Sequence, residues 1–151
     1  MDVVPDFVDI LELFARHRVR YLIVGGLAFI YHAKPRYTKD INLWIDPDHE
    51  NVRRANRALD EFGSPSLMTI DDPDEILQLG VAPNRIDILR ETISLTFDEV
   101  WPRRIESRYG GAPANWIDID SLLAIKAAID HPRHQEDARV LRAVRDRRKD
   151  H

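Results

Sequence analysis

Two stretches of the chain place polar side chains at spacings that suit metal binding. Asp40 and Asn42 stand two residues apart in a stretch that alternates polar and apolar residues, and Asp87 lies later in the chain between two isoleucines. Residues i and i+2 of a strand project from one face, and a third side chain from a neighbouring strand completes a cluster. Oxygen ligands suit Mg²⁺ or Mn²⁺, and two such ions stabilise the attacking and leaving oxygens of an in-line displacement. Such a cluster would suit the binding of divalent ions.

A glycine pair, Gly25 and Gly26, follows an apolar stretch at 20–24. Glycine lets the backbone approach a ligand closely, and the N–H groups at the start of a following helix attract a phosphate. Taken alone, a glycine pair after a strand is most often a plain turn, and an alternating strand is most often half-solvated. The glycine pair, the polar pair and the single acid occur here together and in this order, so the plain interpretation of each must be weighed against their conjunction.

The elements that must position these residues alternate between helices and strands. Apolar spacing and turn residues predict strands over 20–24, 40–46 and 85–90, a hairpin of 105–109 with 114–117, and helices over 5–17, 27–32, 47–62, 97–103, 121–129 and from about 133 onward. Residues 73–80 predict one short helix. We expect strand 40–46 to be half-buried, and Asp118 or Asp120 to cap the helix at 121–129.

The composition is that of one soluble domain. The chain has 151 residues, of which 44% are apolar and 32% charged, and it contains no cysteine, which excludes disulfides and zinc–thiolate sites. Its apolar runs are too short to span a membrane and its N-terminus lacks a secretory pattern, so we expect a cytoplasmic protein with no membrane partner. The net charge is −4, but basic side chains outnumber acidic ones over residues 101–151, which suits a polyanion or simply a solvated helix face.

The stretch 36–45 carries a resemblance to a known family. Its pattern Arg-x-Thr-x-Asp-Ile-Asn-Leu resembles the Arg-x-Thr-x-Asp-Ile-Asp-Leu stretch of bacterial nucleotidyltransferases related to the AbiEii abortive-infection toxins. With the glycine pair and the acid at 87, the chain resembles the DNA polymerase β-like nucleotidyltransferase superfamily over about 21–144, although residues 64–84 match nothing. The resemblance implies an α+β fold with a small mixed sheet and C-terminal helices. We expect a single domain over 1–151, with a catalytic core at about 18–110 and the C-terminal helices at about 118–149.

The resemblance also implies roles for individual residues. Asp40, Asn42 and Asp87 would be catalytic and would hold Mg²⁺ or Mn²⁺, with Asp87 assisting deprotonation of the attacking hydroxyl. The nucleotide-binding residues would be Gly25, Gly26, Arg36, Thr38, Lys126 and Asp137. Lys126 would contact the triphosphate, and Asp137 would position Lys126 or a substrate group. Without the resemblance, Lys126 is interpreted as a snorkelling surface lysine and Asp137 as a carboxylate on a helix surface.

The resemblance further implies a reaction and its partners. An NTP would donate its nucleoside monophosphate to a hydroxyl of an acceptor, with release of pyrophosphate. The acceptor would be RNA, such as tRNA, or a protein, in a toxin–antitoxin or phage-defence setting with a cognate toxin or antitoxin as partner.

Asn42 departs from the family pattern, which has an aspartate there. An amide oxygen ligates a cation but carries no charge, so the metal site is weakened. Asp46 does not replace the lost carboxylate, because four residues along a strand amount to roughly 13 Å. Three explanations stay open: natural degeneration to a binding-only protein, an active enzyme with a modified metal site, and a deliberate inactivating substitution. The alternative function is thus a catalytically impaired module of the same fold that binds nucleotides or a protein.

Overall fold

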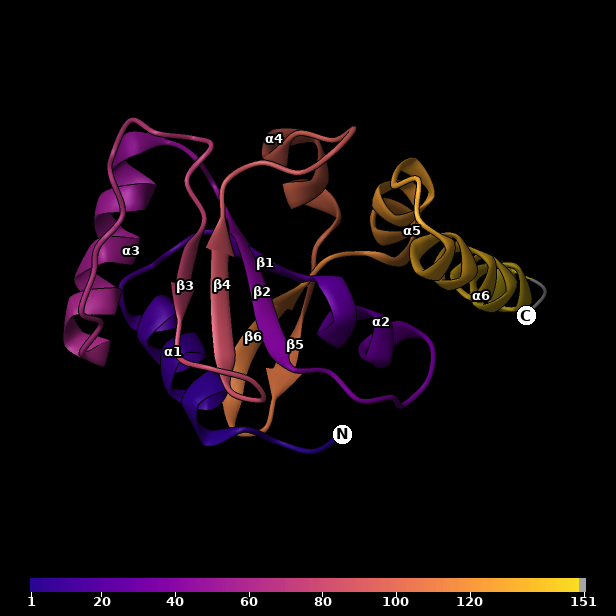
Figure 1. Ribbon diagram of the computed structural model, residues 1–151, viewed down its shortest axis with the longest axis horizontal. Helices are drawn as coiled ribbons and strands as arrows, with labels where there is room; N and C mark the ends of the chain where they lie inside the picture. The colour runs from indigo at the N-terminus through magenta and orange to yellow at the C-terminus, as the bar shows by residue number, and fades with distance from the viewer. Residues whose placement is uncertain (150–151) are drawn as a thin grey trace.

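A six-stranded mixed sheet runs through the protein (Figure 1). The computed structural model describes residues 1–149. The strands are β1 (Tyr21–Val24), β2 (Asp40–Ile45), β3 (Leu77–Leu79), β4 (Arg85–Leu89), β5 (Ile105–Tyr109) and β6 (Ala112–Trp116), and their spatial order is β3-β4-β2-β1-β6-β5. Strand β2 pairs antiparallel with β1 and parallel with β4, so the two strands predicted to carry the acidic residues are neighbours at the centre of the sheet.

Strand β2 is buried more completely than its alternating sequence predicts. The expectation of a half-buried strand is wrong, because Ile41 and Leu43 are buried on one face and Trp44 is buried on the other. The indole N–H of Trp44 donates to the carbonyl of Arg90 at 3.1 Å, and its ring meets Phe97 edge to face. On the face that carries Trp44, Asn42 is the one strand residue that is partly exposed. The candidate site forms around it.

In the view of Figure 1, two groups of helices lie on opposite sides of the sheet, and one short helix lies above the ends of the strands. They are α1 (Pro5–Arg16), α2 (Gly25–His32), α3 (His49–Phe62), α4 (Phe97–Val100), the 3₁₀ turn η1 (Trp101–Arg103), α5 (Ile119–Ala128) and α6 (Pro132–Lys149). Helices α1 and α3 pack against each other, as do α5 and α6, and α2 contacts both members of the latter pair. The carboxylate of Asp118, rather than that of Asp120, caps α5 by accepting the N–H of Ser121 at 3.1 Å. Within residues 1–149, no helix is both long and apolar enough to cross a membrane.

The short helix expected over residues 73–80 is absent, and this segment contains strand β3 instead. Leu77 and Leu79 pair in register with Ile88 and Ile86 of β4, while Gln78 between them is exposed. Two leucines two residues apart cover a strand edge, whereas a helix here would need an apolar stripe and a surface to pack on. Pairing with β4 therefore decides the conformation of a segment whose local sequence is ambiguous.

Candidate functional site

The glycine pair forms the first turn of α2, which begins two residues earlier than expected, directly after β1. Gly25 has φ +69°, and a Cβ added to it would lie 2.5 Å from Nδ2 of Asn42. A Cβ on Gly26 would lie 3.0 Å from the hydroxyl of Thr38. The positive φ and these close approaches explain the glycines. They also place backbone N–H groups at the start of α2 beside the beginning of β2.

The parallel pairing of β2 with β4 brings the predicted polar residues together. In this register Asp40 stands opposite Arg85, and Asn42 stands opposite Asp87. Because side chains alternate along a strand, all four project from the same face of the sheet. The structure thus gathers the three residues expected from the sequence and adds Arg85, which that reasoning missed. The signal was present, since Arg85 lies two residues before Asp87 on the same strand.

We call the cluster of Asp40, Asn42, Arg85 and Asp87 the carboxylate side of the site. The Arg85 guanidinium donates from Nη2 to Oδ2 of Asp40 at 2.7 Å and to Oδ2 of Asp87 at 3.1 Å, and from Nε to Oδ1 of Asp87 at 3.1 Å. Nδ2 of Asn42 donates to the remaining oxygen, Oδ1 of Asp40, at 3.3 Å. Burial raises the pKa of Asp87 above its ordinary value, although the bonds from Arg85 oppose this shift. Each carboxylate oxygen of the pair therefore accepts a hydrogen bond from a side chain of the protein itself.

A second cluster consists of Arg36, Lys126 and Asp137. We call it the phosphate side, after the role that the family resemblance implies for it. The Arg36 guanidinium donates to both oxygens of Asp137, at 2.6 and 3.0 Å, and Nζ of Lys126 lies 3.1 Å from Oδ2 of the same carboxylate. Lys126 and Asp137 are each only 4% exposed, so their interpretation as surface residues is wrong. Burial lowers the pKa of Lys126. Burial raises the pKa of Asp137, but the bonds from the two cations outweigh this effect and the net pKa lies below the ordinary value.

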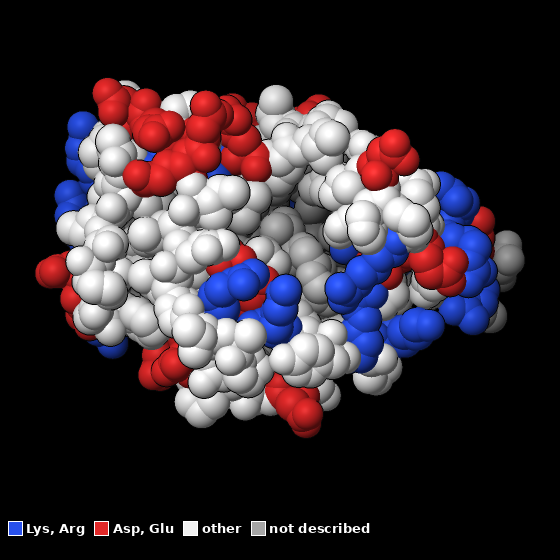
Figure 2. Space-filling view, in the orientation of Figure 1, with Lys and Arg blue, Asp and Glu red and all other residues white. Residues whose placement is uncertain are grey.

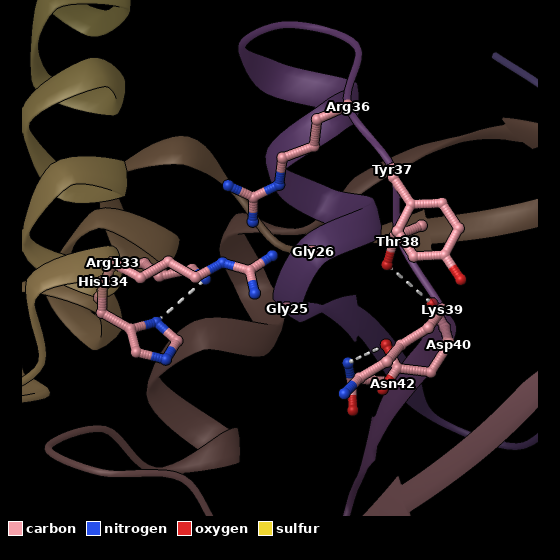
Figure 3. A pocket seen from close by; sticks show the side chains of 11 residues that line it. Gly25, Gly26, Arg36, Tyr37, Thr38, Lys39, Asp40, Asn42, Arg133 and His134 are labelled. Atoms are coloured by element: carbon pink, nitrogen blue, oxygen red, sulfur yellow. Dashed lines mark hydrogen bonds between the residues drawn. The ribbon is translucent and has the colours of Figure 1, made fainter. Parts of the chain in front are cut away.

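A cavity of about 530 Å³ lies between the two clusters. Its lining residues are Gly25, Gly26, Arg36, Tyr37, Thr38, Lys39, Asp40, Asn42, Lys126, Arg133 and His134. In Figure 3, Thr38, Asp40 and Asn42 stand on one wall and Arg133 and His134 project from α6 on the other. Figure 2 shows Lys and Arg side chains on both sides of the hollow in this face. Asp87, Arg85 and Asp137 do not line the cavity. Arg85 connects Asp87 to the lining residue Asp40, and Asp137 pairs with the lining residues Arg36 and Lys126.

The sequence reasoning missed four lining residues, Tyr37, Lys39, Arg133 and His134. Lys39 lies within the stretch that carries the family pattern, so its basic charge beside Asp40 was a usable signal. His134 points its Nδ1 toward Nζ of Lys126 at 3.2 Å, and burial together with this ammonium lowers the pKa of the imidazole. No local pattern places Arg133 or His134 in the site, because they reach it only through the packing of α6 against α5.

Comparison with known proteins identifies the fold. No family model and no curated protein matches the chain. Among solved structures, the chain is similar to the lincosamide antibiotic adenylyltransferase LnuA with lincomycin bound, at 18% sequence identity and a TM-score of 0.59, over 95% of this chain and 99% of that one. The chain has a nucleotidyltransferase fold. The expected α+β architecture with a small mixed sheet is thereby confirmed, whereas the grouping with AbiEii-type toxins stays a prediction.

Within this nucleotidyltransferase fold, the carboxylate side has the donor types that a divalent ion accepts. Asp40, Asp87 and the amide oxygen of Asn42 are the hard ligands that Mg²⁺ and Mn²⁺ prefer. A single nitrogen of Arg85 contacts both carboxylates, which shows that they converge on one point. Residues 1–149 contain no group of three or more His, Asp or Glu side chains able to hold a metal ion. The set fits such an ion by its chemistry, provided that Arg85 withdraws and that the Asn42 amide, whose Nδ2 faces Asp40, turns its oxygen toward the ion.

An apolar pocket of about 380 Å³ adjoins the polar cavity of the nucleotidyltransferase fold. It shares Gly25, Asn42, Lys126 and His134 with that cavity. Its other lining residues are Val24, Leu89, Thr92, Ile93, Leu122, Ile125 and Ile129. The site therefore has a polar, basic compartment and an apolar compartment that meet at the glycine turn.

Proposed function

We propose that this protein binds a nucleoside triphosphate and transfers its nucleoside monophosphate to a hydroxyl acceptor, releasing pyrophosphate. The observation that carries the proposal is the 530 Å³ cavity, which joins the glycine turn, the polar pair of β2 and the buried Lys126 in one space. The family resemblance assigns these three parts to the reaction. Lys126 lies about 100 residues after the glycine turn in the sequence, and the fold brings the two together. The divalent-ion requirement, the acceptor and the cytoplasmic location belong to this same proposal.

The polar cavity suits a triphosphate because its basic charge exceeds its acidic charge on the phosphate side. Arg36 and Lys126 both pair with the carboxylate of Asp137, so this cluster has a net charge of one positive unit. Lys39 and Arg133 add two exposed cations at the rim. The N-terminus of α2 presents backbone N–H groups and the positive end of its dipole to the same space. A triphosphate placed between the turn and α6 would thus meet cations on both sides.

The carboxylate side would carry the transfer step. Asp40, Asp87 and the amide oxygen of Asn42 would hold a divalent ion, which when bound stabilises charge on the phosphate oxygens during in-line displacement. The attacking hydroxyl loses its proton as its oxygen bonds to the α-phosphorus and the bond to the pyrophosphate oxygen breaks. Asp87 is the carboxylate proposed to take this proton, which is the role that the family resemblance implies for it.

The acceptor proposed first is RNA, such as tRNA, or a protein, in a toxin–antitoxin or phage-defence setting with a cognate partner. Its support is the resemblance at 36–45 and the basic surplus over residues 101–151. Basic side chains on α6 border the opening of the cavity, where a polyanion would approach (Figure 2).

The adjoining apolar pocket favours a second candidate acceptor, a small hydroxyl-bearing molecule with an apolar face. A pocket of about 380 Å³ lined by Val24, Leu122, Ile125 and Ile129 buries an apolar molecule well, whereas an RNA end has little apolar surface to place there. Gly25 and Asn42, which belong to the proposed transfer site, also line this pocket.

An alternative function is that of a catalytically impaired module that binds nucleotides or a protein. Two observations favour it: Asn42 carries no charge, and every carboxylate oxygen of Asp40 and Asp87 already accepts a hydrogen bond from Arg85 or Asn42.

The deciding experiment is calorimetric titration of each of the four NTPs, with and without Mg²⁺. Arg133→Ala is expected to weaken NTP binding, whereas Arg142→Ala, an exposed arginine on the same helix outside the lining residues, is the matched control and is expected to leave it unchanged. Label transfer from an α-labelled NTP to cellular RNA, to proteins or to hydroxylated small molecules then separates the acceptors. If the wild type and the Asn42→Asp variant both fail to bind any NTP, the proposal is wrong. Binding without transfer to any acceptor would select the impaired module.

A further inference from the structure

Arg85 is a cation inside the carboxylate side that the proposed transfer step does not use. The register of β2 and β4 places it opposite Asp40, and its position two residues before Asp87 turns it to the same face. Its guanidinium binds Asp87 with two nitrogens and Asp40 with one, in the fork geometry that arginine prefers with carboxylates. The pair of acids that would ligate an ion is therefore already neutralised in part by the chain.

We propose that Arg85 is a resident counter-cation that competes with a divalent ion for Asp40 and Asp87, so that the ion binds only when the guanidinium withdraws. The inference rests on the proposed function for the presence of such an ion, but its test needs no nucleotide and no turnover. The chemical class of ligand that Arg85 opposes is a hard divalent cation such as Mg²⁺ or Mn²⁺.

The competition follows from distance and charge. Nη2 of Arg85 lies 2.7 and 3.1 Å from one oxygen of each carboxylate, at the point on which both converge. A Mg²⁺ ion needs its ligand oxygens at about 2.0–2.1 Å, so the ion and the guanidinium cannot share that point. Two cations at neighbouring positions also repel each other. Asn42 strengthens the effect, because it contributes no negative charge that would favour a second cation.

Arg85 has room to withdraw. Its side chain is 27% exposed, whereas those of Asp40 and Asp87 are 12% and 8% exposed. The carboxylates are thus held in the sheet while the Arg85 side chain already reaches solvent in part, so that it can rotate further into solvent without unfolding β4. Displacement costs the three hydrogen bonds to the acids and the attraction between the charges, and this cost lowers the affinity for the ion.

The test is Mn²⁺ binding followed by the electron paramagnetic resonance signal of the free ion. Arg85→Gln is expected to bind Mn²⁺ at least about tenfold more tightly than the wild type, because a neighbouring positive charge is removed. Adding Asp87→Asn to this variant is expected to abolish the gain. Arg145→Gln is the matched control, since that side chain is 26% exposed and pairs with Asp120 outside the site. It is expected to bind Mn²⁺ like the wild type.

Equal Mn²⁺ affinity in Arg85→Gln and the wild type, whether tight or weak, would overturn the inference. A second measurement on the wild-type protein guards against misfolding of the variant. The Nε–H resonance of Arg85 is expected to shift when Mg²⁺ binds, because its bond to Asp87 is lost. Saturation with Mg²⁺ that leaves this resonance unchanged would also overturn the inference. Failure of NTP binding with a preserved Mn²⁺ gain would count against the proposed function alone.

Discussion

Both sides of the cavity are held together by ion pairs that share a partner, but the phosphate side has an excess of cations and the carboxylate side an excess of anions. On the phosphate side, two cations, Arg36 and Lys126, share the single carboxylate of Asp137. On the carboxylate side, one cation, Arg85, is shared by two acids. The first cluster keeps a net positive charge and is ready to attract an anion, whereas the second keeps a net negative charge but has its oxygens engaged. We therefore expect nucleotide binding to depend on the phosphate side, and metal loading to depend on opening the carboxylate side.

The largest effect is expected from Asp137→Asn, which removes the only carboxylate that the phosphate side contains. Arg36 and Lys126 would then be held close together without their counter-charge, and Lys126 is almost fully buried. Leaving a buried charge unpaired typically costs roughly 3 kcal/mol in the free energy of unfolding. Urea denaturation of the variant and the wild type measures this loss.

Glu136→Gln is the matched control for that substitution. Glu136 is the preceding residue on α6, is exposed, and pairs with Arg139. Surface ion pairs of this kind contribute little, so its stability should stay close to that of the wild type. If Asp137→Asn behaves like Glu136→Gln, the phosphate side is not an electrostatically coupled cluster and the comparison between the two sides fails.

Gly25→Ala tests the connection between the two sides at the glycine turn. Gly25 and Gly63 both have positive φ, at +69° and +90°, so alanine at either position is strained by about 1–2 kcal/mol. A Cβ at Gly63 meets nothing within 4 Å, whereas at Gly25 it meets Asn42. We therefore expect Gly25→Ala to lose about 1 kcal/mol more than Gly63→Ala in denaturant unfolding, a typical cost of overpacking. Equal losses would mean that Asn42 moves aside freely and that the turn does not hold the carboxylate side in place.

The carboxylate side could be predicted from the sequence because its pattern is local. Asp40 and Asn42 share a face by the period of a strand, and Asp87 stands alone between isoleucines that must be buried. What the sequence does not state is which strands are neighbours. The role of Arg85 depends on the parallel register that sets it opposite Asp40, and that register is a property of the whole sheet.

The phosphate side could be predicted only through the family resemblance. Lys126 and Asp137 look like ordinary polar residues of amphipathic helices, and their burial comes from α5 and α6 packing against each other and against α2. Arg133 and His134 carry no local signal for the same reason. The segment 73–80 shows a related limit, because its two leucines are compatible with either a helix or a strand until β4 supplies a partner.

Asn42→Asp sharpens the comparison by adding the charge that the carboxylate side lacks. The Mn²⁺ affinity is expected to rise about tenfold, since a third carboxylate replaces a neutral amide next to the ion. The same titration of free Mn²⁺ measures it, and the double variant with Arg85→Gln shows whether the two gains are independent. Residues in contact commonly couple, so we expect the combined gain to differ from the product of the single gains. No gain from Asn42→Asp would mean that this position does not limit the metal site.

The smallest effect expected is a pH dependence that arises from His134, which lies against Lys126 of the phosphate side. Burial and the ammonium of Lys126 lower the pKa of His134 in the folded protein, although Asp137 opposes the shift. Its unfolded pKa is about 6.5, so the unfolded chain takes up this proton first as the pH falls. The contribution of His134 to the free energy of unfolding is therefore fully present above about pH 6.5. It decreases as the pH falls below this value, and the decrease ends once the pH is below the pKa of His134 in the folded protein. Denaturation curves between pH 7.5 and pH 5 should therefore show a decline that is shallower in His134→Gln, whose amide does not titrate. An equally steep decline in that variant would place the acid sensitivity elsewhere, and the phosphate side would then keep its charge balance unchanged across this range.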